Sequence, residues 1–327
     1  FRTDLAARFE NYEDFGSTSN FKATGRLQLN DEFALRGAAS TGFRAPTIGQ
    51  SMVRNVTTSF TAGKGLVDNA TLPPTHPISV LKGGKPLTPE ESVNLSFGGV
   101  VEIDDLYMTL DYFNIAVDDR ISQSSSQELT PEDITALLAL GVSDASSYAG
   151  VKYFTNDFDT TTQGVDFVAN YGLDAMGGRT TLALAANWTS TNVDKHSSNI
   201  NEAKVKQIED GLPHVRGSFT VSQNNGDIRG YVRLNYFGNY FEDHADSGAL
   251  RVEDDGLPLF LGSEMTLDVE ATYVIDENFE VSLGANNLLD ETPDENRWAD
   301  VLGAQYPTTA VMGFNGGFYY GRLNYKF

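Results

Sequence analysis

The sequence is dominated by stretches in which apolar and polar residues alternate. In "GFYYGRLNYKF", Leu323, Tyr325 and Phe327 fall on one side, and Asn324 and Lys326 fall on the other. A period of two is typical of a β-strand with one apolar and one polar face. We count twelve such stretches, and many have the ~9–11 residues that a tilted strand needs to cross a bilayer. The pattern predicts an all-β chain that forms a transmembrane antiparallel β-barrel, with about twelve strands.

The connections between these stretches alternate in length. Outer-membrane barrels have short periplasmic turns and longer extracellular loops, so we expect residues 1–327 to form one barrel domain with both ends of the chain on the periplasmic side. Only 13–18 is short where a long loop is expected. The predicted turns are 30–32, 102–105, 174–178, 224–227 and 276–278, and the predicted loops are 44–90, 122–158, 191–212, 242–262 and 290–312.

Composition excludes several classes of function. The chain has no cysteine, so it has no disulfide, zinc–thiolate site or cysteine nucleophile. Its net charge of −22 disfavours nucleic acid as a partner. Much of this charge lies in the acidic stretches 241–256 and 288–300, which form either a solvated surface or a Ca²⁺ site. In 126–141, Thr130, Pro131 and Asp133 predict the capped start of a short amphipathic helix.

No motif for catalysis or for a cofactor is present. The four histidines, His76, His196, His214 and His244, lack the spacing of a metal-binding pair. There is no GxSxG nucleophile elbow. We therefore predict no metal, no cofactor and no enzymatic activity, although a hydrolase with a Ser/His pair at the barrel rim remains an alternative.

Ligand contacts are expected in the long loops. Loop 44–90 is the longest and carries several basic residues, while aromatic side chains in other loops suit stacking on a polar ligand such as a glycan. For each residue the alternative is packing within its own loop. The candidates are Arg54, Phe60, His76, Tyr240, Phe241 and Trp298.

Five segments resemble TonB-dependent outer-membrane receptors, in the order that the family has them. "LRGAASTGFRAPTIGQ" (35–50) is similar to the family's "GFRAP" strand, with Phe43, Arg44, Ala45 and Pro46 at the motif positions. Residues 86–122 resemble its PE-S element, with Pro89 and Glu90 in place. The other matching segments are "TNDFDTTTQGVDFVANYGL" (155–173), "LGANNLLDETP" (283–293) and the terminal "YYGRLNYKF".

The resemblance implies a larger receptor. Such receptors have a barrel of about 22 strands with a plugged lumen, and TonB supplies the energy for transport through the plug. The chain would be the C-terminal portion of this barrel, or else a truncated relative whose twelve strands close on themselves. The implied partners are the rest of the barrel and its plug, the TonB complex, the barrel-assembly machinery, the lipid bilayer and a small-molecule or oligosaccharide ligand.

The resemblance also implies a location and a cargo. The location is the outer membrane of a Gram-negative bacterium, where Phe327 would help the assembly machinery to recognise the chain. The cargo would be a ferric siderophore, haem, cobalamin or an oligosaccharide, and the sequence does not choose among them. A passive porin and a soluble β-protein remain alternatives to the receptor.

Overall fold

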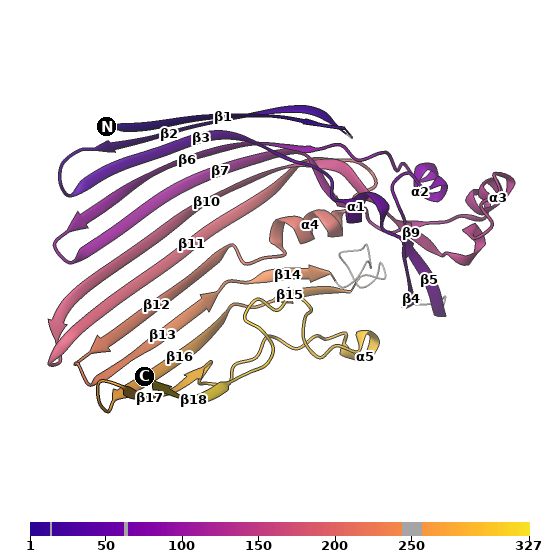
Figure 1. The fold of residues 1–327 in the computed structure, drawn as a ribbon. Coiled ribbons are helices and arrows are strands. Elements are labelled where there is room, and N and C mark those ends of the chain that lie inside the picture. Colours follow the sequence, from indigo (N-terminus) through magenta and orange to yellow (C-terminus); the bar gives the residue numbers. More distant parts are fainter. Residues whose placement is uncertain (14, 62–64, 244–256) are drawn as a thin grey trace.

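A computed structural model describes residues 1–13, 15–61, 65–243 and 257–327. Within these residues, twelve long strands form one antiparallel sheet (Figure 1). No helix in this part of the chain is long and apolar enough to cross a membrane. The strands, in sheet order, are β1 (Arg2–Tyr12), β2 (Gly16–Gln28), β3 (Phe33–Arg44), β6 (Glu90–Ile103), β7 (Leu106–Gln123), β10 (Phe154–Ala175), β11 (Gly178–His196), β12 (Val215–Asn224), β13 (Ile228–Phe237), β16 (Glu264–Val274), β17 (Phe279–Asn286) and β18 (Phe318–Tyr325).

The predicted all-β fold and the alternation of connections are confirmed. Short turns gather at one end of the sheet together with both termini, and the long loops gather at the other end (Figure 1). The turn between β10 and β11 has only two residues, Met176 and Gly177, both with positive φ. This geometry suits a tight hairpin because its twist matches that of the flanking strands. We refer below to the turn end and the loop end of the sheet.

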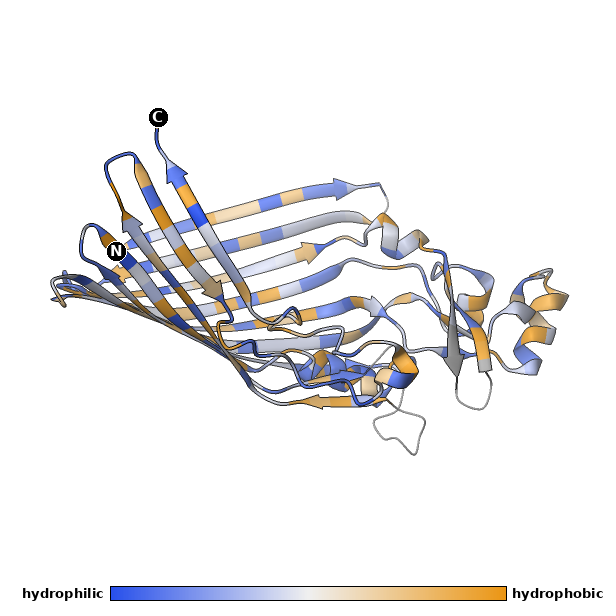
Figure 2. Cartoon of the chain, turned by 90° about the horizontal axis from the view of Figure 1, so that it is seen from below, coloured by the Kyte–Doolittle hydropathy of each residue, from blue (hydrophilic) through white to orange (hydrophobic). Residues whose placement is uncertain are grey.

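The two faces of the sheet differ as predicted. Figure 2 shows hydrophobic and hydrophilic residues alternating along the strands. Outer-face side chains are exposed in this chain, for example Phe97 at 61% and Leu323 at 68%. Aromatic residues of this face also lie near strand ends, among them Trp188 towards the loop end and Tyr273 towards the turn end. Such a face suits lipid with interfacial aromatic girdles, whereas a soluble sheet would cover it.

The inner face is polar and charged. Arg36 Nε donates to Asp111 Oδ1 at 2.7 Å from two strands away, and Arg322 Nη2 donates to Glu270 Oε1 at 3.0 Å. Asn235 Nδ2 donates to Asp268 Oδ2 at 2.9 Å. The two arginine pairs join strands that are not neighbours, and the Asn235–Asp268 pair joins the neighbouring strands β13 and β16. All three lie on the side that would face the lumen.

The sheet is open. Among the described residues, β1 pairs only with β2, and β18 pairs only with β17. The structure therefore shows a partial barrel and not a closed twelve-stranded one. The side chain of Phe327 is fully exposed beyond β18 and its ring lies 5.2 Å from that of Tyr325, while its role in assembly remains a prediction.

The long loops are more ordered than plain connections. Strands β7 and β10 extend to Gln123 and from Phe154, further than the predicted loop 122–158 allows, because they continue to pair beyond the wall. The loops contain a second sheet, in the order β4 (Asn55–Thr61), β5 (Gly65–Thr71), β9 (Gly150–Lys152) and β8 (Gln127–Glu128), and a hairpin of β14 (Tyr240–Asp243) and β15 (Pro258–Leu261). They also contain α1 (Ile48–Met52), α2 (Pro77–Leu81), α3 (Pro131–Ala139), a 3₁₀ turn η1 (Ala145–Ser147), α4 (Glu202–Asp210) and α5 (Ala299–Leu302).

The predicted helix in 126–141 is confirmed. Helix α3 begins after Thr130, whose hydroxyl accepts from the Asp133 N–H at 3.2 Å. The Asp133 carboxylate in turn accepts from the Thr130 N–H at 2.9 Å. This reciprocal capping box satisfies two N–H groups that a helix otherwise leaves without partners.

The outer face predicts a depth-dependent response to charge. Phe97→Arg, near the middle of β6, should destabilise the membrane-inserted protein by about 2–4 kcal/mol, because a lipid-facing arginine near the bilayer midplane costs that much. Ser96→Arg on the inner face is the matched control and should have a much smaller effect. Unfolding in lipid vesicles measures both, and equal effects would contradict the assignment of faces.

Candidate functional site

The segment "FRAPTIGQ" marks the point where β3 leaves the wall at the loop end. Arg44 is the last residue of β3, and Pro46 follows two residues later. Proline has no N–H and restricts Ala45 before it to extended geometry, so the ladder of hydrogen bonds ends here. Helix α1 then begins, with Thr47 and Gln50 forming a capping box.

Arg44 and Glu90 connect the two family motifs. Arg44 Nε donates to Glu90 Oε2 at 2.5 Å, and a second hydrogen bond joins Nη2 to Oε1. Glu90 Oε1 also accepts from the Ile121 N–H at 2.7 Å, and Glu90 is 7% exposed. One buried carboxylate therefore holds the loop ends of β3, β6 and β7 together, in the bidentate geometry that guanidinium and carboxylate favour.

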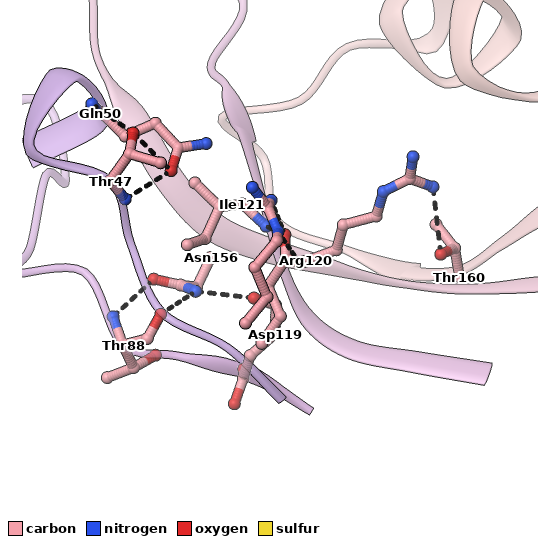
Figure 3. Close-up of polar contacts among 10 residues, drawn as sticks. Thr47, Gln50, Thr88, Asp119, Arg120, Ile121, Asn156 and Thr160 are labelled. Carbon is pink, nitrogen blue, oxygen red and sulfur yellow. Dashed lines mark hydrogen bonds and ion pairs between the residues drawn. The ribbon is translucent and has the colours of Figure 1, made fainter. Parts of the chain in front are cut away.

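Asn156 extends this junction to β10 (Figure 3). Its Nδ2 donates to the carbonyls of Thr88 at 2.8 Å and Asp119 at 2.6 Å, and its Oδ1 accepts from the Thr88 N–H at 2.9 Å. Beside it, Arg120 donates to Thr160 Oγ1 at 3.2 Å. We call Arg44, Thr88, Glu90, Ile121 and Asn156 the rim junction. It fixes the segment around Pro89 against the end of the wall.

One further motif position, Phe43, and two residues that were not predicted, Asn156 and Asp119, complete the description of this end of the wall. Phe43 packs its ring 5.4 Å from Tyr12 and 6.1 Å from Phe15, which joins β3 to the β1–β2 connection. Sequence reasoning placed Arg44 and Glu90 in separate motifs and did not predict their contact. It missed Asn156 and Asp119, for which no pattern in the sequence gives a signal.

The first and second long loops form one module, which we call the first loop module (45–89 with 124–153). Strand β5 of the first loop pairs with β9 of the second, and both loops share one hydrophobic core. Two ion pairs also cross between them, Arg54 with Asp144 at 2.6 Å and Lys82 with Asp133. The core consists of Ala70, Leu72, Ile78, Leu129, Leu137, Ala145, Tyr148 and Val151.

Arg54 and His76 both lie in this module, in structural roles. His76 caps α2, with Nδ1 accepting from the Ile78 N–H at 3.3 Å. Burial, together with the charge of Arg54, lowers the pKa of His76, while Asp144 acts in the opposite direction. The two residues predicted from the longest loop are thus near each other, and ligand contact by either remains a prediction.

The β14–β15 hairpin and the last long loop (287–317) form a second unit, which we call the hairpin clamp. Two side chains of the last loop bind one backbone carbonyl of the hairpin. Arg297 Nη2 donates to the Pro258 carbonyl at 2.8 Å, and Trp298 Nε1 donates to the same carbonyl at 3.3 Å. Trp298 packs against Tyr240, Leu259 and Leu261.

Tyr240, Phe241 and Trp298 therefore come together in the hairpin clamp. Tyr240 and Phe241 are 3% and 1% exposed, so as they stand they present no stacking surface. Phe241 lies 5.4 Å from the Phe260 ring and accepts a cation–π contact from Lys206 of α4 at 5.3 Å. Trp298 contributes to this packing, and ligand contact by any of the three remains a prediction.

Glu242 makes four hydrogen bonds in the hairpin clamp, and sequence reasoning missed it. It is 2% exposed, and its carboxylate accepts from the N–H groups of Thr308 at 3.0 Å and Thr309 at 2.9 Å. Both threonine hydroxyls donate to it as well. Burial alone would raise the pKa of Glu242, but these four hydrogen bonds outweigh burial and lower it.

The second and third long loops meet at two half-buried lysines, Lys152 and Lys204. Burial, together with the charge of Lys204, lowers the pKa of Lys152 to about 8. Backbone contacts join the same loops: Ser125 donates its N–H to the Asn199 carbonyl at 3.0 Å. Helix α4 follows, and its cap, Asn201, was a usable signal for a helix that we did not predict.

Some predictions fall outside what the structure describes. They are the side chain of Phe60 and, within the acidic stretch 241–256, residues 244–256 with His244. Over the described residues, no group of three or more His, Asp or Glu side chains is placed to hold a metal ion.

The comparison with protein families decides the identity. The model of the "TonB dependent receptor-like, beta-barrel" family matches residues 1–288. The chain belongs to this family. Membership confirms the resemblance on which the motif assignments rest, and it implies the outer membrane. No curated protein matches the chain.

Solved structures of similar fold are receptors and transporters. The siderophore receptor PirA from Acinetobacter baumannii is 16% identical, with a TM-score of 0.64 over 99% of this chain and 43% of that one. A variant of the ferric enterobactin receptor PfeA from Pseudomonas aeruginosa, in complex with enterobactin, is 16% identical, with a TM-score of 0.66 over 99% of this chain and 43% of that one. The copper transporter OprC is 15% identical, with a TM-score of 0.58 over 95% of this chain and 39% of that one. This member of the TonB-dependent receptor-like barrel family thus spans less than half the length of these proteins.

The rim junction predicts a difference between two adjacent glutamates. Glu90→Ala should destabilise the loop end of β3, β6 and β7 by about 1–3 kcal/mol, because Arg44 and the Ile121 N–H lose their buried acceptor. Glu91→Ala, at an exposed position, should stay within about 0.5 kcal/mol of the parent. Hydrogen exchange of residues 119–123 measures the effect, and unchanged exchange in Glu90→Ala would rule out the junction.

The hairpin clamp predicts a loss of order in acid. Because the pKa of Glu242 is lower in the folded chain than its unfolded value of about 4.3, Glu242 stabilises the clamp above that pH and ceases to do so as the pH falls through the folded pKa. Amide exchange at 308–311 should accelerate there. Glu242→Gln should accelerate it already at neutral pH, whereas the exposed Glu291→Gln should not.

Proposed function

We propose that the chain is part of the wall of a TonB-dependent receptor that captures a scarce nutrient outside the cell and admits it through the outer membrane. The observation that carries this proposal is the match of the family model to a wall with a lipid-type outer face, a charged inner face and structured loops at one end. The cargo would be a metal chelate such as a ferric siderophore, haem, cobalamin or an oligosaccharide.

The inner face supports a protein partner in the lumen. Near the turn end it carries a polar hollow lined by Ser222, Tyr231, Glu270, Glu280 and Arg322, among others. Arg229 pairs with Glu280 across this hollow. Such a surface needs polar partners or water, because charged groups away from both are costly. A plug domain packed against the inner face would supply them, and TonB would act through that plug.

Transport is tested in the whole receptor. Uptake of the cargo into cells should require TonB and the energised inner membrane, and it should stop when either is removed. Uptake that continues without TonB, together with steady ion conductance in planar bilayers, would instead support the passive porin. Activity on an ester or glycoside that is lost on replacing one serine or histidine would support the hydrolase.

The plug contact is tested by labelling. Because the chain has no cysteine, single cysteines report one position each. Ser222→Cys in the hollow should react with a water-soluble maleimide more slowly in the intact receptor than after removal of the plug. Ala139→Cys, exposed on α3, is the matched control and should react equally in both. Equal rates at Ser222→Cys would contradict a plug in contact with this face.

A further inference from the structure

A carboxylate without a partner lies beneath the hairpin clamp. Glu264 is the first residue of β16, opposite Phe237 of β13. Both of its carboxylate oxygens are buried, and neither has a hydrogen-bond partner in the structure. A buried carboxylate in this state is costly. In native proteins, such a group usually has an ordered water or an ion as its partner.

A second group without a partner points to the same place. The hydroxyl of Tyr240 is buried and lacks a hydrogen-bond partner, and the residue is only 3% exposed. Burial, followed by the negative charge of Glu264, raises the pKa of Tyr240, and Asp294 adds to this effect. Strand pairing agrees, because it places Tyr240 opposite Leu261 and Phe237 opposite Glu264. The phenol and the two carboxylates therefore lie in one region of the clamp. The nearby Val311 N–H acts in the opposite direction but forms no hydrogen bond of good geometry with the hydroxyl.

Asp294 closes the site from the last loop. Its Oδ2 accepts from the Gly262 N–H at 2.7 Å, which fixes it against the segment that leads into Glu264. Its charge and its backbone N–H act on the Glu264 carboxylate in opposite directions, and the N–H forms no hydrogen bond of good geometry with it. Among the residues that the structure describes, no cation influences Glu264. Asp294 is exposed, so solvent reaches its side of the site, while the Glu264 carboxylate oxygens and the Tyr240 hydroxyl are buried.

We propose that Glu264, Asp294 and Tyr240 bind a calcium ion, which joins the β14–β15 hairpin to the last loop. All of the available donors are oxygen atoms, the type that Ca²⁺ takes, and two carboxylates offer up to four of its 6–8 ligands. Water would supply the rest on the side of Asp294.

The charge of the surrounding loops favours a cation. Residues 238–263 and 287–317 contain eleven acidic residues and only two arginines. With two carboxylates and not three, the site belongs to the weak class of about 10⁻⁴–10⁻³ M that serves extracellular modules. The inference requires only that these loops face the outside of the cell, and it does not depend on which cargo is transported.

Terbium luminescence tests the site in the whole purified receptor. Tb³⁺ in the place of Ca²⁺ should be sensitised by Tyr240 and Trp298, and Ca²⁺ should displace it. Glu264→Gln and Asp294→Asn should each weaken the binding of Ca²⁺ at least ~10-fold. Glu291→Gln, which removes an exposed carboxylate from the same loop, should leave it unchanged.

Hydrogen exchange gives an independent readout. Ca²⁺ should slow amide exchange in 258–263 and 294–298 of the parent and of Glu291→Gln, but not of Asp294→Asn. Because Asp294 is at the surface, this variant decides the matter even if Glu264→Gln does not fold. Binding unchanged in Asp294→Asn, or exchange that does not respond to Ca²⁺, would overturn the proposal. Since this assay involves no transport, its failure would not affect the proposed receptor function.

Discussion

The structure depends on the requirement that backbone N–H and C=O groups facing lipid find partners within the protein. Strand pairing meets this requirement along the twelve-stranded wall, and it places each apolar side chain outward and each polar one inward. A shift of one residue in any pair would reverse the two faces of a strand. The contacts that fix register are therefore as important to the fold as the apolar surface itself.

The rim junction fixes register at the loop end. Backbone pairing alone does not anchor the ends of the four strands β3, β6, β7 and β10 where they lead into long loops. These ends are anchored by the bidentate contact of Arg44 with Glu90 and by the three hydrogen bonds of Asn156. The family motifs acquire a physical meaning from this arrangement. Glu90 is a buried charge that Arg44, itself exposed to solvent, compensates.

The wall could be predicted from the sequence because its period of two is local and repeats twelve times. The structure of the loops could not be predicted from the sequence, because it depends on contacts between segments far apart in the chain, such as β5 with β9 and Glu242 with Thr308. Helix α3 was found from its capping residues, and α4 was missed although Asn201 gave the same kind of signal. Tyr240 and Phe241 were predicted as ligand contacts from residue type alone, which does not reveal that they are buried.

The first loop module can tolerate substitutions on its surface. Its stability rests on a small interior around Leu72, Ile78 and Leu137, all fully buried, and its outward surface contributes little to that interior. Substitutions on the outward surface therefore leave both the module and the register of the wall intact. A surface of this kind can change its antigenic character rapidly while the protein beneath it stays the same.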